Sequence, residues 1–413
     1  MAQTRIVITG LGVLCPVGIG KHAVWEALQA GRSGVKRITL FDPSPYPVQI
    51  AGEVKGFDPG TLGSPKEVRR MDRYTQLSLA AAREAVADAG LGKEDLDAET
   101  AGVLIGSAAG GFQTLLEQQQ VLLERGPKRV SPFFIQNMLV DSAAGQVAIA
   151  LGLRGPNMAA VSACATGTQA IGEAALMIQR GDADVMLAGG AETPIHPVIL
   201  SGFAVWHALA RNNEQPERAS CPFTLDRDGF VLSEGAAVVV LESLERARAR
   251  GATIYAEVAG AAATCDAYDM ADMPEDGAMA AACMRKAVKR AGLQPEDIDY
   301  INAHGTSTPL NDKVETLAIK TVFGDHAYRL AVSSTKSMTG HMMGASGAVE
   351  TVACALALRD GIIPPTINYE RPDPACDLDY VPNVARPAAV RATLSNSFGL
   401  GGHNASIVLR KVD

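Results

Sequence analysis

Two stretches of this chain, one in each half, resemble each other and indicate that the molecule is built from two similar units. Residues 81–107 read AAREAVADAGLGKEDLDAETAGVLIGS, and residues 281–307 read AACMRKAVKRAGLQPEDIDYINAHGTS. Both contain an alanine-rich helical stretch, an AGL turn, an acidic segment and then a strand. A second pair, 167–181 and 347–361, consists of alanine-rich helices that each end at a glycine. Because both pairs occur in the same order, we interpret the chain as a duplication.

The duplication predicts an N-terminal half over residues 1–250 and a C-terminal half over residues 251–413, related by a pseudo-twofold axis. Short apolar runs at 5–9, 101–105, 185–188 and 236–241 have the composition of buried strands. They alternate with helical stretches, which is typical of an α/β protein whose parallel or mixed sheet is covered on both faces. We therefore expect the chemistry where the equivalent strand-to-helix turns converge.

Charge and cysteine usage exclude several classes of protein. The net charge is -8, so the chain as a whole lacks the basic excess needed to hold nucleic acid or an anionic membrane. We find no signal peptide and no run of about 18 apolar residues that would span a membrane. The seven cysteines form no C-x-x-C pair, which argues against a disulfide framework or a thiolate zinc site and favours the cytoplasm.

The best candidate nucleophile is Cys164, in the segment VSACATGTQA. This segment runs from a strand into a helix of small residues, so Cys164 is expected at a helix N-terminus. There the helix dipole and free N–H groups favour a thiolate and could also stabilise an oxyanion. The alternative is a buried structural cysteine, and position alone does not decide between the two.

His304 in NAHGTSTP and His341 in KSMTGHMMG lie at expected strand ends, in glycine-bounded loops. Neutral imidazoles there can donate a hydrogen bond to a thioester oxygen and stabilise an enolate. Metal binding is the rival interpretation, but no H-x-x-x-H or H-E-x-x-H spacing is present. Lys336 and Glu350 flank His341, either as solvated surface residues or as an ion pair that holds its loop.

Other motifs are weak. Gly10 and Gly12 follow the first strand without the third glycine of a dinucleotide fingerprint, and Gly20-Lys21-His22 lacks the serine or threonine of a P-loop. The segment LSNSFGLGGHN, which contains Phe398 and Leu400, is a strand followed by a glycine-rich loop. That loop can bring a backbone N–H group close to a reacting carbonyl, act as a gate, or simply be flexible.

With Cys164 after VSA, His304 in NAHGTST and His341 in SSTKSMTGH, the sequence resembles the condensing enzymes called β-ketoacyl-acyl-carrier-protein synthases, type II. The likeness extends over nearly the whole chain. It implies the thiolase fold, in which two duplicated halves form a five-layered αβαβα core. It also implies a homodimer in which residues 131–138 reach the partner's acyl pocket.

The resemblance also assigns roles. It implies that an acyl carrier protein acylates Cys164, after which a malonyl carrier loses CO2 and its enolate attacks the Cys164 thioester, elongating a fatty acyl chain by two carbons. No organic cofactor and no metal is expected. The residues to which it gives roles are His304 and His341 at the malonyl oxygen, Lys336 and Glu350 as their support, the N–H groups of Cys164 and Leu400 as the oxyanion hole with Phe398 in the gate, Ala109 and Phe134 in the acyl pocket, Thr306 and Thr308 at the substrate, and Lys66, Arg69, Arg70, Lys128 and Arg129 at the carrier.

Four positions depart from the family's pattern. Leu400 replaces a gating phenylalanine, which leaves the backbone N–H but puts the gate in doubt. Ala109 replaces a bulkier aliphatic residue, so longer or branched chains are expected to fit. His207 replaces an arginine that often contacts the carrier, and Ser233 replaces a glycine for which the sequence gives no explanation.

Four alternatives stay open at this point. A ketosynthase of a polyketide or aryl-polyene pathway shares all these residues. A non-catalytic chain-length partner would lack the cysteine at position 164. A thiolase would need a second catalytic cysteine, but Cys354 falls inside a helix and Cys376 in a proline-rich loop. A cysteine hydrolase would transfer the acyl group to water.

Overall fold

The computed structural model describes residues 4–92, 95–96 and 98–412. Apart from the short β2 (Gly18–Ile19), which pairs with β1, its main sheet consists of two five-stranded parts that meet where Val7 and Ile8 of β1 pair with β9. The first part has the order β6-β5-β7-β8-β1 and the second has the order β11-β10-β14-β15-β9. Their strands are β1 (Ile6–Cys15), β5 (Ala101–Gly106), β6 (Asn157–Met158), β7 (Val185–Glu192), β8 (Gly235–Ser243), β9 (Ala256–Cys265), β10 (Tyr300–Asn302), β11 (Ala331–Ser333), β14 (Ala392–Gly399) and β15 (His403–Arg410).

The two parts have the same topology. From the shared seam outward, each has two antiparallel pairings followed by two parallel ones. In chain order β1, β5, β6, β7 and β8 correspond to β9, β10, β11, β14 and β15. This correspondence is the arrangement that the sequence repeat predicts, while the division of the chain at residue 250 stays a prediction.

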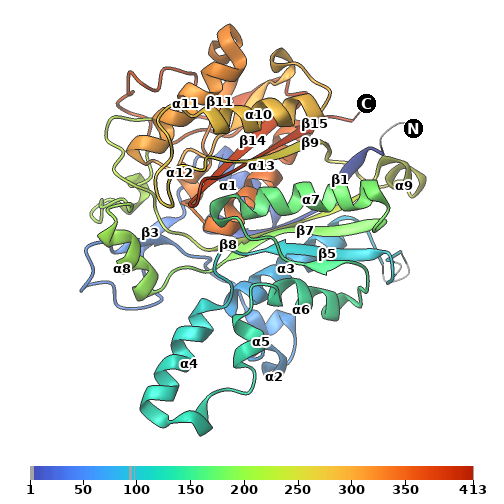
Figure 1. Cartoon of the computed structure of the whole chain (residues 1–413), viewed down its shortest axis with the longest axis vertical. Helices are drawn as coiled ribbons and strands as arrows, with labels where there is room; N and C mark the ends of the chain where they lie inside the picture. Colours follow the sequence, from blue (N-terminus) through green and yellow to red (C-terminus); the bar gives the residue numbers. More distant parts are fainter. Residues whose placement is uncertain (1–3, 93–94, 97, 413) are drawn as a thin grey trace.

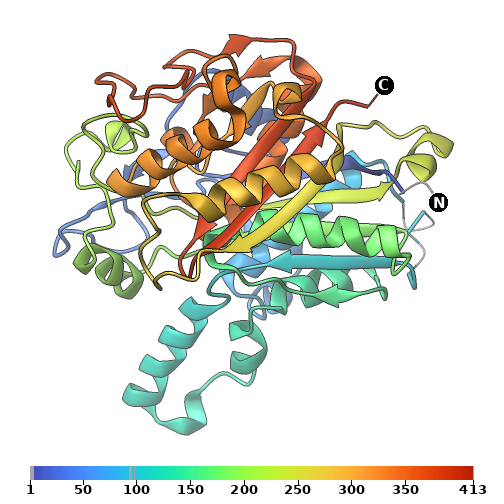
Figure 2. The same cartoon turned by 45° about the horizontal axis from the view of Figure 1, so that its top comes forward.

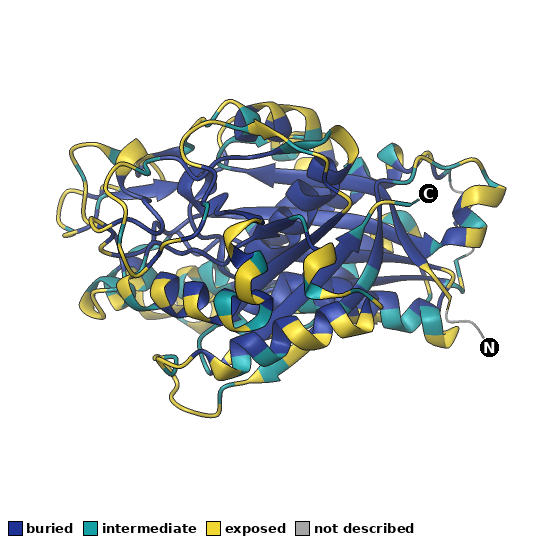
Figure 3. Ribbon diagram, turned by 90° about the horizontal axis from the view of Figure 1, so that it is seen from above, coloured by how far each residue is buried: buried dark blue, intermediate teal, exposed yellow. Residues whose placement is uncertain are grey.

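Helices cover both faces of the two sheet parts and also fill the space between them (Figure 1, Figure 2). The layers are α3 (Arg73–Asp88) with α6 (Ser142–Leu151), then the first sheet part, then α7 (Thr166–Arg180) with α13 (Ser346–Asp360), then the second sheet part, and finally α10 (Ala278–Arg290) with α11 (Pro309–Phe323). Five layers, αβαβα, are therefore present. Buried residues concentrate in the sheet and the two middle helices (Figure 3).

The middle helices cross at two glycines that the repeat makes equivalent, Gly167 and Gly347. A Cβ atom on Gly167 would lie 2.7 Å from the backbone nitrogen of Ala348, and one on Gly347 would lie 2.8 Å from that of Thr168. Side chains at either position would push the helices apart. The small residues of both segments are therefore explained by close helix packing, and α13 is buried from Ser346 to Leu358.

Glycines also explain the weak motif after the first strand. A Cβ atom on Gly10 would lie 2.1 Å from the carbonyl oxygen of Ala85, and one on Gly12 would lie 1.9 Å from that of Ala81. These glycines let α3 pack directly on β1, which extends to Cys15 and so runs further than the predicted strand at 5–9.

A helical excursion projects from the body of the molecule (Figure 1). It comprises α4 (Phe112–Arg125), η2 (Pro127–Arg129) and α5 (Phe134–Met138). The buried carboxylate of Asp72 accepts hydrogen bonds from the N–H and hydroxyl of Thr114 at its start, and Tyr74 donates to the carbonyl of Leu139 at its end. Both ends are thus fixed to the first turn of α3.

The remaining elements are short. They are β2 (Gly18–Ile19), α1 (Lys21–Gln29), β3 (Val35–Arg37), β4 (Ile50–Gly52), η1 (Pro59–Leu62), α2 (Pro65–Val68), η3 (Ala163–Ala165), α8 (Pro197–Val205), η4 (Pro216–Arg218), α9 (Leu244–Ala249), η5 (Pro295–Asp297), η6 (Gly324–Tyr328), α12 (Lys336–Thr339), η7 (Met343–Ala345), β12 (Ile362–Ile363) and β13 (Arg386–Pro387). Among the described residues, no helix has the length and apolar character needed to cross a bilayer.

Candidate active site

Two equivalent turns lie at the centre of the molecule. Cys164 is in η3, directly before α7, and its counterpart by the repeat is Gly344 in η7, directly before α13. The residues before them, Ala163 and Met343, have φ angles of 49° and 47°, which non-glycine residues adopt only rarely. The duplication therefore extends to the backbone of the turns, and only the first turn carries a nucleophile.

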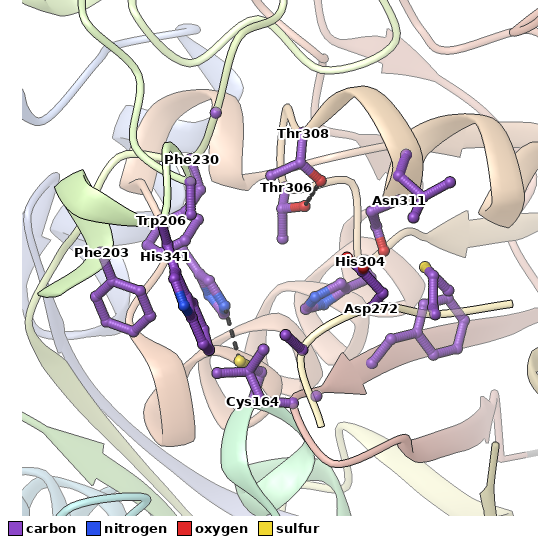
Figure 4. Close-up of a pocket in the computed structure, with 18 of the residues that line it drawn as sticks. Cys164, Phe203, Trp206, Phe230, Asp272, His304, Thr306, Thr308, Asn311 and His341 are labelled. Carbon is purple, nitrogen blue, oxygen red and sulfur yellow. Dashed lines mark hydrogen bonds between the residues drawn. The ribbon is translucent and has the colours of Figure 1, made fainter. Parts of the chain in front are cut away.

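His341 faces the nucleophile from the second half. Its Nε2 atom lies 3.1 Å from Sγ of Cys164 (Figure 4). Its Nδ1 atom lies 3.0 Å from Oγ of Ser346. The hydroxyl of Ser346 also accepts the N–H of Met342. Because a hydroxyl can donate to Nδ1 or accept from it, His341 can take or give a proton at Nε2.

The backbone of His341 is held by the segment around Ser233. The N–H of His341 donates to the carbonyl of Val231 at 2.7 Å, and the N–H of Ser233 donates to the carbonyl of His341 at 3.0 Å. The Oγ atom of the buried Ser233 would lie 2.0 Å from a Cβ atom on Gly340. Ser233 thus fills the space beside Gly340, which explains how a residue larger than the family's glycine is accommodated.

His304 follows β10 and lies beside His341. Their ring centroids are 5.4 Å apart, and the ring of Phe398 packs against His304 at 5.6 Å. The buried carboxylate of Glu315 accepts the N–H groups of His304 and Gly305, each at 2.8 Å. Glu315 therefore fixes the backbone of the loop, and burial raises its pKa to about 7.

Lys336 and Glu350 form an ion pair in the core, since each side chain is only 1% exposed. Burial, assisted by the positive charge of Lys336, lowers the pKa values of His304 and His341 well below the usual 6.5. Both imidazoles are consequently neutral at pH 7. A neutral imidazole is the form that can act as a base or donate a single hydrogen bond.

Contrary to the expectation from the sequence, the helix N-terminus does not lower the pKa of Cys164. Burial raises the pKa of Cys164 to about 12, although the charge of Lys336 and the backbone N–H groups of Leu400 and Cys164 act in the opposite direction. The predicted donors are present, but desolvation outweighs them. The thiol is therefore protonated at rest and must lose its proton as it attacks.

The same two backbone N–H groups, of Cys164 and Leu400, converge on the sulfur atom. Donors in that position can hold an oxyanion that forms on a carbonyl carbon bound to the sulfur. Leu400 is in the loop after β14, and Phe398 and Leu400 both line the adjoining cavity. The structure therefore brings together the residues predicted to form the oxyanion hole and the gate.

A cavity of about 540 Å³ opens from the surface down to Cys164, His304 and His341. Thr306 and Thr308 line one of its walls, with their hydroxyl oxygens 3.0 Å apart (Figure 4). The opposite wall includes three aromatic residues, Phe203, Trp206 and Phe230.

Sequence reasoning missed Glu192, at the end of β7. Its buried carboxylate accepts the hydroxyl of Ser107 and the N–H groups of Ala108, Ala109 and Gly344. It therefore joins a loop of the first half to the turn that follows His341. No local signal marks it, because it completes a strand of ordinary composition.

The other predicted residues lie outside the cavity lining that the structure describes. Ala109 is exposed and Phe134 is half-buried. Of the basic residues, Lys66, Arg69, Lys128 and Arg129 are exposed, whereas Arg70 lies over the ring of Phe133, 4.6 Å from its centroid. In the described part of the chain, no group of three or more histidine, cysteine or carboxylate side chains could hold a metal ion.

Comparison with known proteins agrees with this geometry. Residues 3–247 match the family model of the β-ketoacyl synthase N-terminal domain, and residues 255–370 match that of the C-terminal domain. The chain is 50% identical over 412 residues to a 3-oxoacyl-acyl-carrier-protein synthase 2 of Coxiella burnetii, with 100% of both chains covered. A protein of the same name from Synechocystis is 48% identical over 411 residues, covering 100% of this chain and 99% of the relative.

Solved structures give the same answer for the fold. A type II polyketide ketosynthase in complex with its acyl carrier protein superposes with a TM-score of 0.92 at 37% identity, and the ishigamide ketosynthase/chain length factor with 0.93 at 37%. Each match covers 100% of this chain and 100% of the neighbour. The five layers are therefore the thiolase-like fold that the sequence predicts, and the chain belongs to the β-ketoacyl synthase family.

Proposed function

We propose that this protein is a β-ketoacyl-acyl-carrier-protein synthase of type II, an acyltransferase that elongates fatty acyl chains by decarboxylative condensation. The observation that carries the proposal is the contact of 3.1 Å between Cys164 and His341 in a cavity that His304 also lines. One nucleophile with two neutral imidazoles suits a reaction in which an acyl group is first stored and then attacked by an enolate.

In the first half-reaction, the sulfur of Cys164 attacks the carbonyl carbon of the acyl thioester. His341 accepts the thiol proton at Nε2 as the bond forms, since the thiol is protonated at rest. The N–H groups of Cys164 and Leu400 hold the oxyanion. The intermediate then expels the carrier's thiolate, which takes the proton back from His341, and the acyl group remains on Cys164.

In the second half-reaction, a malonyl thioester enters and its carbonyl oxygen accepts hydrogen bonds from His304 and His341. The bond between C2 and the carboxylate breaks, CO2 leaves, and the electron pair forms an enolate that the two donors stabilise. C2 then attacks the acyl carbon, and the C–S bond to Cys164 breaks. The product is a 3-oxoacyl thioester two carbons longer, and the thiolate of Cys164 regains a proton.

The buried ion pair of Lys336 and Glu350 supports this chemistry electrostatically. The charge of Lys336 opposes protonation of both histidines and stabilises the thiolate as it forms. Glu350 balances the buried positive charge. We assign this pair an electrostatic role without contact to the substrate.

We propose that the partner is an acidic acyl carrier protein. The exposed side chains of Lys66, Arg69, Lys128 and Arg129 offer it positive charge. The hydroxyl groups of Thr306 and Thr308 face the cavity, where they would hydrogen-bond the amides of its pantetheine arm. His207, at the cavity rim, contacts the guanidinium group of Arg211, so a positive charge remains where the family often has arginine.

We further propose that the protein is a homodimer formed along the edge strand β6. Large apolar side chains that would be covered there are exposed, namely Ile135, Leu139, Ile149, Met158 and Val161, at 60, 44, 76, 45 and 57%. An edge strand flanked by such side chains is a pairing site. The dimer would also cover Ala109 and Phe134, which we keep as acyl-pocket residues. Sedimentation equilibrium should give twice the chain mass for the wild type, and Ile149→Asp should shift the equilibrium to monomer.

The decisive experiment is intact mass spectrometry of the purified protein. Incubation with a medium-chain acyl carrier protein should add one acyl group that malonyl carrier protein then removes, yielding a 3-oxoacyl carrier two carbons longer. Cys164→Ala should take up no acyl group. An acyl group that is lost to water without malonyl carrier would indicate a hydrolase, and no acylation of the wild type would indicate a non-catalytic partner.

A ketosynthase of a type II polyketide pathway is the second candidate. One structural neighbour is the ketosynthase of a type II polyketide system, and the other is a ketosynthase/chain length factor. Identity is higher to the curated fatty acid relatives, at 50% against 37%. Product analysis separates the two candidates, since a polyketide enzyme extends its 3-oxo product again without reduction. A thiolase is disfavoured because Cys354 and Cys376 are buried outside the cavity lining.

A further inference from the structure

We infer that Trp206 is a specificity-determining residue whose indole ring, backed by Phe203, receives the dimethyl-bearing part of a pantetheine arm. This inference rests on the proposed function. It adds a residue that favours substrates with a complete pantetheine arm over substrates that end before its dimethyl group. Trp206 directly follows α8 at the rim of the active-site cavity, and its side chain lines that cavity. It is 54% exposed.

Aromatic contacts hold the indole in place from behind. The ring of Phe203 lies 6.2 Å from that of Trp206, and the ring of Phe230 lies 5.2 Å from that of Phe203. Phe230 in turn packs edge-on against His341 at 5.3 Å. These rings form a continuous row from the rim to the catalytic histidine, so the wall is pre-organised.

The facing wall of the cavity carries hydrogen-bonding side chains beside apolar ones such as Met273 and Leu310. Thr306, Thr308, Asn311 and Asp272 lie across the opening from Phe203 and Trp206 (Figure 4). A ligand that enters between these walls meets hydrogen-bonding groups on one side and aromatic carbon on the other. The cavity therefore suits a chain that is polar along one edge and apolar along the other.

A pantetheine arm has this character. Its two amides and its hydroxyl group require hydrogen-bond partners, whereas the two methyl groups on its quaternary carbon gain free energy from apolar cover. Those methyl groups lie near the end remote from the sulfur, so they come to the rim when the thioester is at Cys164. Trp206 is the aromatic residue at the rim, and the neighbouring His207 and Arg211 leave positive charge for the phosphate beyond.

The adjacent Val205 provides a matched control. It is more exposed than Trp206, at 77%, but it does not line the cavity. Truncation of Val205 removes apolar surface from the same helix end without changing the wall. A general effect of surface hydrophobicity would therefore appear in Val205→Ala as well as in Trp206→Ala.

The test compares two malonyl donors on enzyme that already carries an acyl group on Cys164. Malonyl-pantetheine contains the dimethyl group, and malonyl-N-acetylcysteamine ends before it. Trp206→Ala should raise KM for malonyl-pantetheine about tenfold, which corresponds to losing apolar cover over two methyl groups. Its KM for malonyl-N-acetylcysteamine and its kcat with either donor should stay at wild-type values. Trp206→Phe should restore most of the affinity, and Val205→Ala should match the wild type.

A second readout does not need turnover. The chain has two tryptophans, and Trp25 is only 5% exposed, so a change of tryptophan fluorescence on ligand binding reports mainly on Trp206. Titration of Cys164→Ser with acyl-pantetheine should change the emission, whereas acyl-N-acetylcysteamine should not.

Equal KM changes for both donors in Trp206→Ala, or no change for either, would overturn the inference. So would an emission that both ligands change alike or neither changes. The proposed function fails separately, through the absence of acylation in the mass measurement with wild-type enzyme.

Discussion

Replacement of Gly167 by alanine tests the geometry on which the active site depends. The new Cβ atom would lie 2.7 Å from the backbone nitrogen of Ala348, short of the 3.4 Å at which ordinary contacts begin by about 0.7 Å. The contacted atom belongs to the backbone of α13, and no side-chain rotation can move it. The helices α7 and α13 must therefore separate by a similar distance. Such overpacking costs about 1–3 kcal/mol, and the helix propensity of alanine returns up to about 1 kcal/mol. We expect Gly167→Ala to lower the free energy of unfolding by about 1–2 kcal/mol.

The same displacement separates the groups that react. Cys164 precedes α7 and His341 precedes α13, so moving the helices apart lengthens their contact of 3.1 Å. A misplacement approaching 1 Å slows catalysis by roughly 10- to 100-fold. The assay is the rate of acyl transfer to the enzyme, followed by intact mass, together with urea unfolding of the same samples.

Gly202→Ala is the matched control, because a Cβ atom there meets nothing within 4 Å. It should leave the acylation rate unchanged and keep or slightly raise stability. Wild-type stability and wild-type acylation in Gly167→Ala would refute the argument that this helix contact positions the catalytic pair.

Three further predictions concern the buried charges. Glu350→Gln should lower the free energy of unfolding in urea by about 3–5 kcal/mol, because it leaves the charge of Lys336 buried and unpaired. The double variant with Lys336→Met should recover part of this loss. Equal stability of the single and double variants would contradict the prediction. The pKa values of His304 and His341 lie well below 6.5 in the folded protein, so the unfolded chain takes up protons at a higher pH than the folded one. The free energy of unfolding should therefore fall as the pH drops below about 6.5. Because the charge of Lys336 lowers both pKa values, its removal should move the acid limb of the pH–rate profile to higher pH. Because the pKa of Cys164 is raised to about 12, the rate of its alkylation by iodoacetamide, measured by peptide mass, should rise steadily from about pH 6 to about pH 9; a plateau in that interval would contradict a protonated resting thiol.

The order of helices and strands could be predicted from the sequence because the same pattern occurs in both halves of the chain. Both copies of the helix and strand pattern survive in the chain, and the strands expected at 101–105, 185–188 and 236–241 are β5, β7 and β8. The sequence also placed Cys164 before a helix and His304 after a strand, whereas His341, expected at a strand end, follows the short helix α12 (Lys336–Thr339). Two residues at equivalent turns must meet if two βα halves pack about a common axis.

What the sequence could not supply depends on burial. Glu315 and Glu192 sit in a helix and a strand whose composition gives no reason to expect a buried carboxylate. Glu192 binds backbone N–H groups of loops far away in the chain, and Glu315 binds those of His304 and Gly305 in the loop that precedes its helix; no pattern of side chains marks either set of contacts. The direction of the pKa shift of Cys164 was mispredicted for the same reason, since desolvation is a property of the surrounding core.

The residues that shape the cavity entrance are also hard to predict. Phe203 lies in α8, Trp206 directly follows that helix, and Phe230 comes from a later segment, so the three rings meet only through tertiary packing. Nothing in their spacing distinguishes a cavity wall from ordinary core. The row of rings is visible only once α8 is placed beside Phe230, which contacts His341.

The unequal turns before α7 and α13 have a consequence for stoichiometry. One turn carries the thiol of Cys164, whereas the equivalent turn has Gly344, whose N–H is bound by Glu192. The centre can therefore store one acyl group per chain and never two. In the mechanism that we propose, each round of elongation therefore joins one stored chain to one arriving malonyl unit.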